Sequence, residues 1–388
     1  MKVVIYTVDC FKERAHLMPW RTILEVATVL QEAGHKIAIL NACNKEKDAF
    51  DYEWAGIDGQ NIDTVQIRSV LKNDEAILTK LKELNPHSLY IPLTFREGMR
   101  QAKWIEKAPC MKIGYMAGGV YDLKSAWLLL QTAGFAAAKP YLLEALAPKN
   151  LFAHTMEQIG ISKFIGLTDT TTNAMKRAGV TNALTIYPGK DPFDTIPADV
   201  DIIKDYGLFG KKWFLFSGAP APTRGAELLL KAVDRVSDET VRLVMLMRTD
   251  VGSVYKEFEN KLENLKHPER VVVIREKLTR EQLRAFFGGA WYALLPFIVI
   301  PSEIPLTFFE LLSCGTPVIT FKNGGTTDYL HNGLLISDKS VHGLTHALEL
   351  AWKDSRLRDN LSNNGKTIMS THPTWKEVGK QWEKLLSK

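Results

Sequence analysis

The sequence from residue 301 to residue 320 is Pro301-Ser-Glu-Ile-Pro-Leu-Thr-Phe-Phe-Glu-Leu-Leu-Ser-Cys-Gly-Thr-Pro-Val-Ile-Thr320. This order predicts a loop, a short helix that Pro305 opens and Gly315 ends, and then a buried strand. A helix entered from a loop after a strand presents free backbone N–H groups to an anion. Glu303 and Glu310 flank the helix start, and carboxylates suit the hydroxyl groups of a sugar or ribose beside such an anion.

Length and charge limit the classes of protein that fit. The chain of 388 residues is too long for one ordinary core, which predicts two domains. Its apolar and charged fractions, 46% and 24%, are those of a soluble globular protein. The net charge of +5 suits a phosphate-bearing ligand or an anionic membrane surface and does not require nucleic acid, so we expect no nucleic-acid partner.

The cysteines and the apolar segments predict a cytoplasmic protein. Four cysteines are scattered without a Cys-x-x-Cys pair, which argues against a disulfide framework or a structural zinc site. The N-terminus runs straight into a predicted strand at Lys2–Val8, so no signal peptide is expected. The apolar segment Ala126–Ala138 is interrupted by Gln131 and Gly134. It is too short to span a bilayer, which takes about 20 residues.

Short β-rich apolar runs alternate with helical patterns along the whole chain, and this alternation is typical of parallel α/β sheets. The clearest helix is Thr22–Ala33, which Gly34 ends. The predicted strands are Val3–Val8, Ile37–Leu40, Val65–Ile67, Ser88–Ile91, Lys112–Met116, Phe164–Thr168, Ala183–Tyr187, Trp213–Ser217, Val241–Met247, Val271–Arg275, Trp291–Leu295, Pro317–Phe321 and Leu334–Ile336.

A linker divides the chain at Pro188–Pro197, where three prolines and a glycine stand within ten residues. We therefore expect an N-terminal Rossmann-like domain over residues 1–190 and a C-terminal one over residues 191–371. Residues 372–388 are predicted to form a capped amphipathic helix, which Pro373 and Thr374 start. Two such domains around a hinge place a ligand cleft between the carboxyl ends of their sheets.

The loop after the first strand of the second half is the better phosphate site. No Gly-x-Gly-x-x-Gly follows the first strand of the chain, which argues against NAD or FAD there. In Trp213–Leu230, a strand, a small-residue loop and a helix follow one another. Gly218 lets the backbone approach a ligand, and Arg224 can give a diphosphate two hydrogen bonds. An exposed arginine without a ligand is the alternative.

Glu310 has a structural explanation as well. The pattern Thr307-x-x-Glu310 is a capping box, which by itself accounts for both residues. Thr307 can also donate its hydroxyl to a phosphate, and Glu310 can accept from ribose hydroxyls while it caps. Glu303 has no such local role, although an exposed loop glutamate is common.

These residues resemble those of the retaining family 4 glycosyltransferases (group 1), which have the GT-B fold. The resemblance rests on Glu303, Glu310 and the block Cys314-Gly-Thr-Pro-Val-Ile319, and it extends to Gly324-Gly325 and the hinge at Ile186–Phe193. It implies an enzyme of the hexosyltransferase type in carbohydrate biosynthesis. The enzyme would transfer a sugar from a nucleotide-diphosphate sugar to an acceptor hydroxyl, with retention and without a metal or cofactor.

The resemblance also implies roles for single residues. Arg224 would bind the diphosphate in the catalytic site, together with Glu303 on the hydroxyls of the transferred sugar. Glu310 would bind the ribose. Gly218, Leu306 and Thr307 would face phosphate or sugar, and the acceptor would lie on the first domain.

Three departures from the family pattern bear on these roles. Glu303 and Glu310 enclose six residues instead of seven. One phosphate-binding cation is missing, and Arg248 or Lys277 is a candidate replacement. The family histidine on the acceptor side is absent, and Gly118-Gly119 stand in that region. His16 is a candidate for the cleft, and a surface histidine is an equally good interpretation.

The sequence specifies the acceptor less well than the donor. The apolar residues in 123–149, beside Lys124, Lys139 and Lys149, suit an anionic membrane at the inner face, and therefore a lipid-linked sugar or polysaccharide precursor. A buried helix of the N-terminal domain explains them equally well. The alternatives for the whole protein are a non-catalytic sugar-nucleotide-binding protein, a GT-B sugar-nucleotide epimerase, for which no set of carboxylates and histidines is found, and an enzyme that glycosylates DNA.

Overall fold

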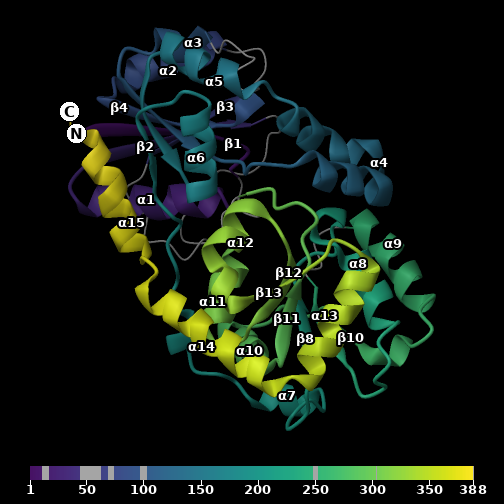
Figure 1. The fold of residues 1–388 in the computed structure, drawn as a ribbon. Helices are drawn as coiled ribbons and strands as arrows, with labels where there is room; N and C mark the ends of the chain where they lie inside the picture. The colour runs from purple at the N-terminus through teal and green to yellow at the C-terminus, as the bar shows by residue number, and fades with distance from the viewer. Residues whose placement is uncertain are drawn as a thin grey trace.

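The computed structural model describes residues 1–10, 17–43, 63–68, 74–96, 103–247, 252–302 and 304–387. Its elements form two lobes, one above the other in Figure 1. Each lobe is built on a parallel β-sheet with helices on both of its faces. The α/β class predicted from the alternation of strands and helices is therefore confirmed.

The N-terminal sheet has seven strands in the order β3-β2-β1-β4-β5-β6-β7. The strand order reverses between β1 and β4, which pair directly. Ligands bind at such a reversal because loops on either side diverge there. The strands are β1 Lys2–Val8, β2 Lys36–Cys43, β3 Asp63–Arg68, β4 Ser88–Leu93, β5 Met111–Met116, β6 Ile161–Gly166 and β7 Ala183–Thr185.

The C-terminal sheet has six strands in the order β10-β9-β8-β11-β12-β13, with the reversal between β8 and β11. Each predicted strand overlaps one of the observed strands, and the differences lie at their ends. The strands are β8 Phe214–Ser217, β9 Leu243–Leu246, β10 Val271–Ile274, β11 Tyr292–Leu295, β12 Val318–Phe321 and β13 Leu334–Ser337.

Helices cover both faces of each sheet and bury one apolar cluster on each face. This two-sided burial explains why the strands are almost wholly apolar. In the first half the helices are α1 Trp20–Glu32, α2 Asp74–Leu84, α3 Lys103–Lys107, α4 Leu123–Ala145, α5 Lys149–Gln158 and α6 Asp169–Arg177. In the second half they are α7 Asp201–Asp205, α8 Ala226–Val233, α9 Gly252–Glu263, α10 Arg280–Gly289, α11 Leu306–Ser313, α12 Gly324–Leu330, α13 Val341–Lys353, α14 Ser355–Thr371 and α15 Trp375–Glu383.

Helix α4 leaves the upper lobe and reaches over the lower one (Figure 1). It is kinked at Gly134, whose φ is +78°. Its buried residues Leu129 and Ala138 pack against the core of the C-terminal sheet, not that of the N-terminal one. The interpretation of this segment as a buried helix of the N-terminal domain is therefore wrong, because the partner of its apolar face is the other domain.

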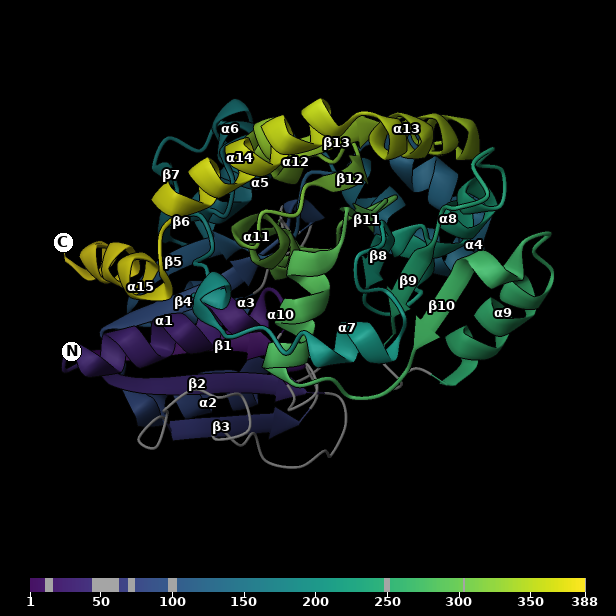
Figure 2. The same ribbon diagram turned by 90° about the horizontal axis from the view of Figure 1, so that it is seen from below.

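Helix α15 returns to the N-terminal sheet and packs along α1 (Figure 2). Thr374 caps it through a capping box with Glu377, as the sequence predicts. Trp382 is fully buried between Tyr90 and Tyr115, and its backbone oxygen accepts a 2.7 Å hydrogen bond from the Tyr90 hydroxyl.

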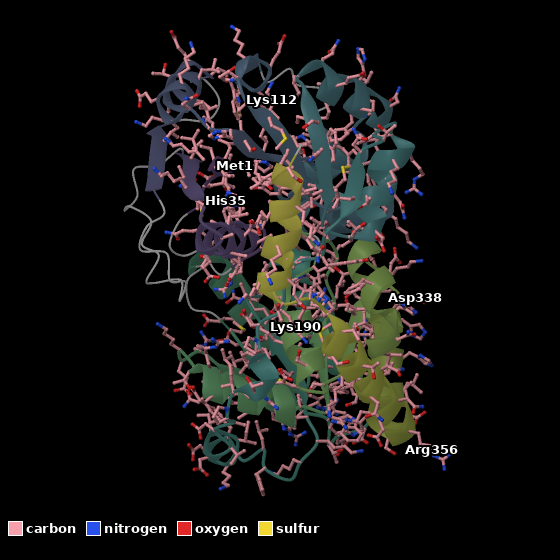
Figure 3. All side chains as sticks on the ribbon, turned by 90° about the vertical axis from the view of Figure 1, so that its left-hand side faces the viewer. Met1, His35, Lys112, Lys190, Asp338 and Arg356 are labelled. Atoms are coloured by element: carbon pink, nitrogen blue, oxygen red, sulfur yellow. The ribbon has the colours of Figure 1, made fainter. Side chains whose placement is uncertain are left out.

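The chain crosses between the lobes at two adjacent segments. Lys190, labelled between the lobes in Figure 3, donates its backbone N–H to Pro373 O at 3.0 Å. Its side chain donates to Met369 O, and the Trp375 indole donates to Asp191 at 2.9 Å. These bonds hold the two crossings together as one hinge.

Candidate active site

The two strand-order reversals place the candidate site between the sheets. On the N-terminal side a cavity of about 410 Å³ lies at the carboxyl ends of β1, β4 and β5. Its wall includes Trp20 of α1, Tyr141 and Glu144 of α4, and Pro301 from the C-terminal lobe. A volume in this range suits a small-molecule ligand rather than a single water.

The loop after β8 has the geometry of an anion site. Gly218 has φ +125°, which L side chains rarely adopt, and a Cβ there would lie 1.8 Å from Arg224 Nη1. The Arg224 guanidinium therefore lies directly over the glycine. It donates to Ser217 O at 3.3 Å and lies 5.3 Å from the centre of the Phe297 ring. The structure brings the two predicted residues of this loop together.

A 3-10 turn, η5 Pro222–Arg224, carries this arginine and is fixed to the loop after β11. Thr223 O accepts from the backbone N–H of Ile298 at 2.8 Å. Gly225 follows with φ +67°, and a Cβ on it would lie 2.2 Å from Pro296 O. Only glycine allows this close approach, so the arginine turn is held against the neighbouring strand's loop.

The predicted capping box of α11 is wrong. The helix begins at Leu306, its N-cap is Pro305, and no side chain caps it. Thr307 lies within the first turn and Glu310 in the middle of the helix, so their spacing does not match the cap and third positions. The proline takes the cap position itself. The N–H groups of the first turn are therefore not satisfied by a capping side chain, which suits an anion.

Glu310 and Leu306 of α11 have different surroundings. Glu310 is half-buried. Its charge acts on Cys314 one turn later, where burial first and Glu310 as a smaller cause raise the thiol pKa to about 12. Leu306 packs against apolar clusters of both lobes, which places the start of α11 at the domain interface.

The remaining predicted residues divide into two groups. Glu303, Arg248 and His16 lie outside the described residues. Lys277 is exposed just after β10, and β9 lies between β10 and β8 in the sheet. The structure does not show a contact between Lys277 and the Arg224 turn.

Gly118 and Gly119 lie in the cleft after β5. Gly118 lines the large cavity, and Gly119 lines a smaller one of about 30 Å³. Tyr121 borders both. Its hydroxyl accepts from Gly119 N at 3.2 Å and donates to Pro301 O at 2.8 Å, so it ties the N-terminal loop to the C-terminal lobe.

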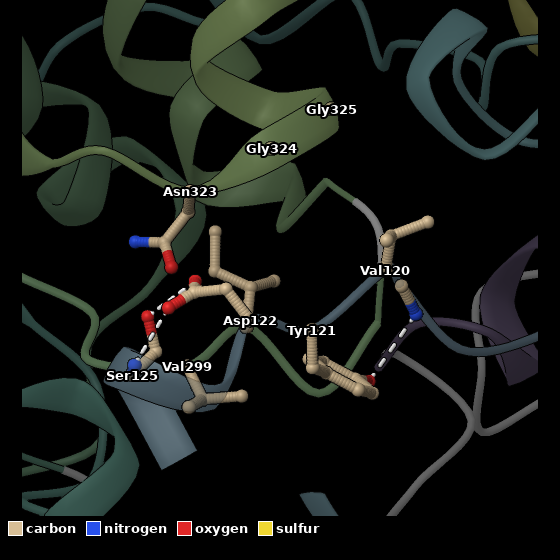
Figure 4. Close-up of a pocket in the computed structure, with 10 residues that line it drawn as sticks. Val120, Tyr121, Asp122, Ser125, Val299, Asn323, Gly324 and Gly325 are labelled. Atoms are coloured by element: carbon tan, nitrogen blue, oxygen red, sulfur yellow. Dashed lines mark hydrogen bonds between the residues drawn. The ribbon is translucent and has the colours of Figure 1, made fainter. Parts of the chain in front are cut away.

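Sequence reasoning found the glycines of the smaller cavity, Gly119 and Gly324-Gly325, but missed its polar side chains, which Figure 4 shows. Asp122 caps α4, accepting from Ser125 N at 2.7 Å and from Ser125 Oγ at 2.6 Å. Asn323 projects toward this pair (Figure 4), and Lys339 donates to both Ser125 and Asn323. The Asp122-x-x-Ser125 cap was the one readable signal, because the other two residues are remote in sequence.

The described residues contain no group of three or more His, Cys, Asp or Glu side chains that could hold a metal ion. Among their helices, none is both long enough and apolar enough to cross a bilayer.

The fold is GT-B, as similar solved structures show. Sucrose-phosphate synthase from Thermosynechococcus elongatus is 14% identical, with a TM-score of 0.75 over 99% of this chain and 98% of that chain. The HepE protein of Anabaena, solved with UDP and glucose, is 14% identical, with a TM-score of 0.69 over 100% and 99%. WaaG, a glycosyltransferase involved in lipopolysaccharide biosynthesis, is 16% identical, with a TM-score of 0.68 over 100% of both chains.

Part of the chain also matches a family model. Residues 201–368 match the family model of the glycosyl transferases group 1. The matched residues lie in the C-terminal lobe and include Arg224 and Glu310. No curated protein sequence matches the chain.

Proposed function

We propose that the protein is a retaining family 4 glycosyltransferase that moves a hexose from a nucleotide-diphosphate sugar to an acceptor hydroxyl. The observation that carries this is Arg224 held over Gly218 at the carboxyl end of β8, inside the segment that matches the group 1 family model. A guanidinium above a backbone that only glycine permits is suited to a diphosphate. The HepE structures from Anabaena, which contain UDP or UDP-glucose, support this ligand class.

The donor-binding roles follow from the chemistry of each group. Arg224 and the first turn of α11 would stabilise the charge of the leaving diphosphate, so no metal is required for that role. Glu310 would accept from the ribose hydroxyls, and Glu303 from the hydroxyls of the transferred sugar. Arg248 and Lys277 are the candidates for a second phosphate cation. In a single-step retaining reaction the acceptor oxygen would bond to the anomeric carbon on the face from which the diphosphate leaves, while the bond from that carbon to the diphosphate breaks and the hydroxyl proton passes to the leaving diphosphate.

Donor binding is tested by thermal shift with UDP-, GDP- and ADP-sugars on the wild type, Arg224→Ala and Glu310→Ala. We expect one nucleotide class to raise the wild-type melting temperature and both variants to lose most of that rise. The controls are Arg235→Ala and Glu263→Ala, because both residues are exposed in the same lobe. If no nucleotide sugar stabilises the wild type, the proposal fails. Stabilisation without donor hydrolysis or transfer would favour the sugar-nucleotide-binding protein instead.

We further propose that the acceptor lies in the large N-terminal cavity and is a lipid-linked sugar or polysaccharide precursor. Support comes from apolar side chains exposed on α4 and just after it. Trp127 is 57% exposed, Phe135 63% and Leu146 64%. Single exposed apolar residues are ordinary, but several spread along one helix and just after it suit a membrane surface. The protein would then act in the cytoplasm at the inner membrane face.

Vesicle flotation tests this contact with full-length protein. We expect binding to phosphatidylglycerol vesicles, weaker binding to phosphatidylcholine, and a several-fold loss in Phe135→Ser. Phe209→Ser is the matched control, because Phe209 is 64% exposed on the other lobe. Equal loss in both variants, or no binding to anionic vesicles, would contradict a membrane role for α4.

A further inference from the structure

Lys339, just after β13, joins segments from both halves of the chain. Its ammonium group donates to Ser125 Oγ at 2.5 Å, to Ile298 O at 3.0 Å and to Asn323 Oδ1 at 3.2 Å. An ammonium has three N–H donors, and these acceptors use all of them. Because every N–H donor of this half-buried lysine is paired, its three contacts form a defined connection between segments and not an incidental surface contact.

The junction continues on both sides of the ammonium. The Ser125 hydroxyl, which accepts from Lys339, itself donates a 2.6 Å hydrogen bond to Asp122, the N-cap of α4. Burial opposes ionisation of Asp122, but the Ser125 hydrogen bonds and the Lys339 charge lower its pKa overall. On the other side, the Ile298 N–H donates to Thr223 O in the turn that carries Arg224. One continuous set of contacts therefore runs from the start of α4 to the candidate phosphate site.

Helix α4 carries this connection across the cleft. Its body contacts the Arg224 turn. Near its other end, Glu144 accepts from the backbone N–H groups of Phe95 and Arg96, in the loop after β4. Burial raises the Glu144 pKa, and those two donors oppose the rise. The helix is thus anchored to the C-terminal lobe at its start and to the N-terminal lobe at its end.

The segments that Lys339 joins also face each other across the small cavity in Figure 4. Ser125 and Asp122 line one side, and Asn323 lines the other. We propose that Lys339 is a positioning residue that holds the cleft closed, by fixing the first turn of α4 to the C-terminal lobe beside the Arg224 turn. Without the ammonium, three oxygen acceptors would lose their donor, and the buried ones could be satisfied only by water that enters as the lobes part.

Hydrogen exchange measures this closure directly. The variants are Lys339→Met, which keeps length and removes the donors, and Ser125→Ala, which removes the hydroxyl between Lys339 and Asp122 and keeps a good helix residue. Lys322→Met is the matched control, because it removes the same charge from an exposed lysine beside Asn323. We expect the Gly119 and Ser125 amides to exchange at least about tenfold faster in Lys339→Met than in the control.

The two test variants separate a positioning role from a general loss of stability. If Lys339→Met does not fold, Ser125→Ala decides, and it should show the same local increase with a melting temperature near that of the wild type. Unchanged exchange at Gly119 in a folded Lys339→Met protein would overturn the proposal. So would an increase spread equally over both lobes.

A kinetic measurement adds a readout that rests on the proposed function. With UDP-glucose hydrolysis as the probe, Lys339→Met should change kcat and KM together, as expected when closure is disturbed, and Lys322→Met should change neither. If the wild type hydrolyses none of the UDP-, GDP- and ADP-sugars, that result counts against the proposed function. The exchange result still decides the role of Lys339.

Discussion

Gly218 and Arg224 lie in close contact in the candidate site, so a larger residue at position 218 would displace the arginine. An alanine methyl at Gly218 would occupy the position of the guanidinium, because a Cβ there lies 1.8 Å from Nη1. We expect Gly218→Ala to abolish most of the rise in melting temperature that the nucleotide sugar causes, as we also expect of Arg224→Ala. The measurement is the thermal shift with the nucleotide sugar that stabilises the wild type.

Backbone strain has to be separated from displacement of the arginine in this test. Gly210 also has positive φ, +73°, but a Cβ there meets nothing within 4 Å. Gly210→Ala should therefore lower the melting temperature and leave the donor-induced rise intact. A loss of that rise in both variants would show that strain, rather than the arginine, is responsible.

His372 makes stability depend on pH. It is 3% exposed, donates from Nε2 to Pro188 O at 2.8 Å, and accepts at Nδ1 from the Tyr329 hydroxyl at 2.7 Å. This is the neutral ring, and burial lowers its pKa to about 4. The unfolded chain binds a proton near pH 6.5, whereas the folded chain does so only near pH 4. Stability is thus lost as the pH falls through this window.

The His372 effect is measurable as a difference between proteins. The wild type should lose up to about 3 kcal/mol between pH 6.5 and 4, at 1.36 kcal/mol per pKa unit. His372→Gln keeps a donor without a titrating ring, so its denaturant-unfolding curve should lose less over the same range. Equal pH dependence in the two proteins would assign the acid sensitivity to other groups.

At the scale of elements, the contact between α15 and α1 depends on one glycine. A Cβ on Gly379 would lie 2.4 Å from the Val29 Cβ, which is on a stiff β-branched side chain. We expect Gly379→Ala to destabilise by about 1–3 kcal/mol, although alanine favours helix. Adding Val29→Ala should recover part of the loss, and Lys376→Ala on the exposed face should change little. Chemical denaturation measures all three.

The elements were more predictable than their contacts. Hydrophobic runs such as Val271–Ile274 and the Thr374 cap of α15 are local signals, so the strands and this helix follow from sequence. The Thr307-x-x-Glu310 spacing failed because Pro305 took the cap position. Lys339 meets Ser125 across 214 positions of sequence, and no local pattern reports such a contact.

At the scale of the whole molecule, Lys339 links closure to pH. Burial lowers its pKa from 10.5 to about 8, with Asp122 opposing the shift and Lys124 adding to it. An open cleft would return the ammonium to water and raise its pKa. Between the two values the closed form binds fewer protons, so raising the pH favours closing. The neutral amine keeps two N–H donors for its acceptors and removes the buried charge.

Small-angle scattering can follow this dependence. Between pH 8 and roughly 10, the ratio of closed to open wild-type protein should rise by up to about tenfold per pH unit. Lys339→Met should show no such trend, and Lys124→Met should retain it. A cleft that opens as the pH rises would contradict the sign derived from the buried ammonium.

The position of α15 has a consequence for synthesis on the ribosome. The N-terminal sheet emerges first, but its face at Tyr90 and Tyr115 is covered only when Trp382 has been made. The C-terminal sheet needs nothing after α14 to complete its strands. The half of the protein that is translated first is therefore the half that finishes folding last, and its bare aromatic face is a natural point for a chaperone to bind in the interval.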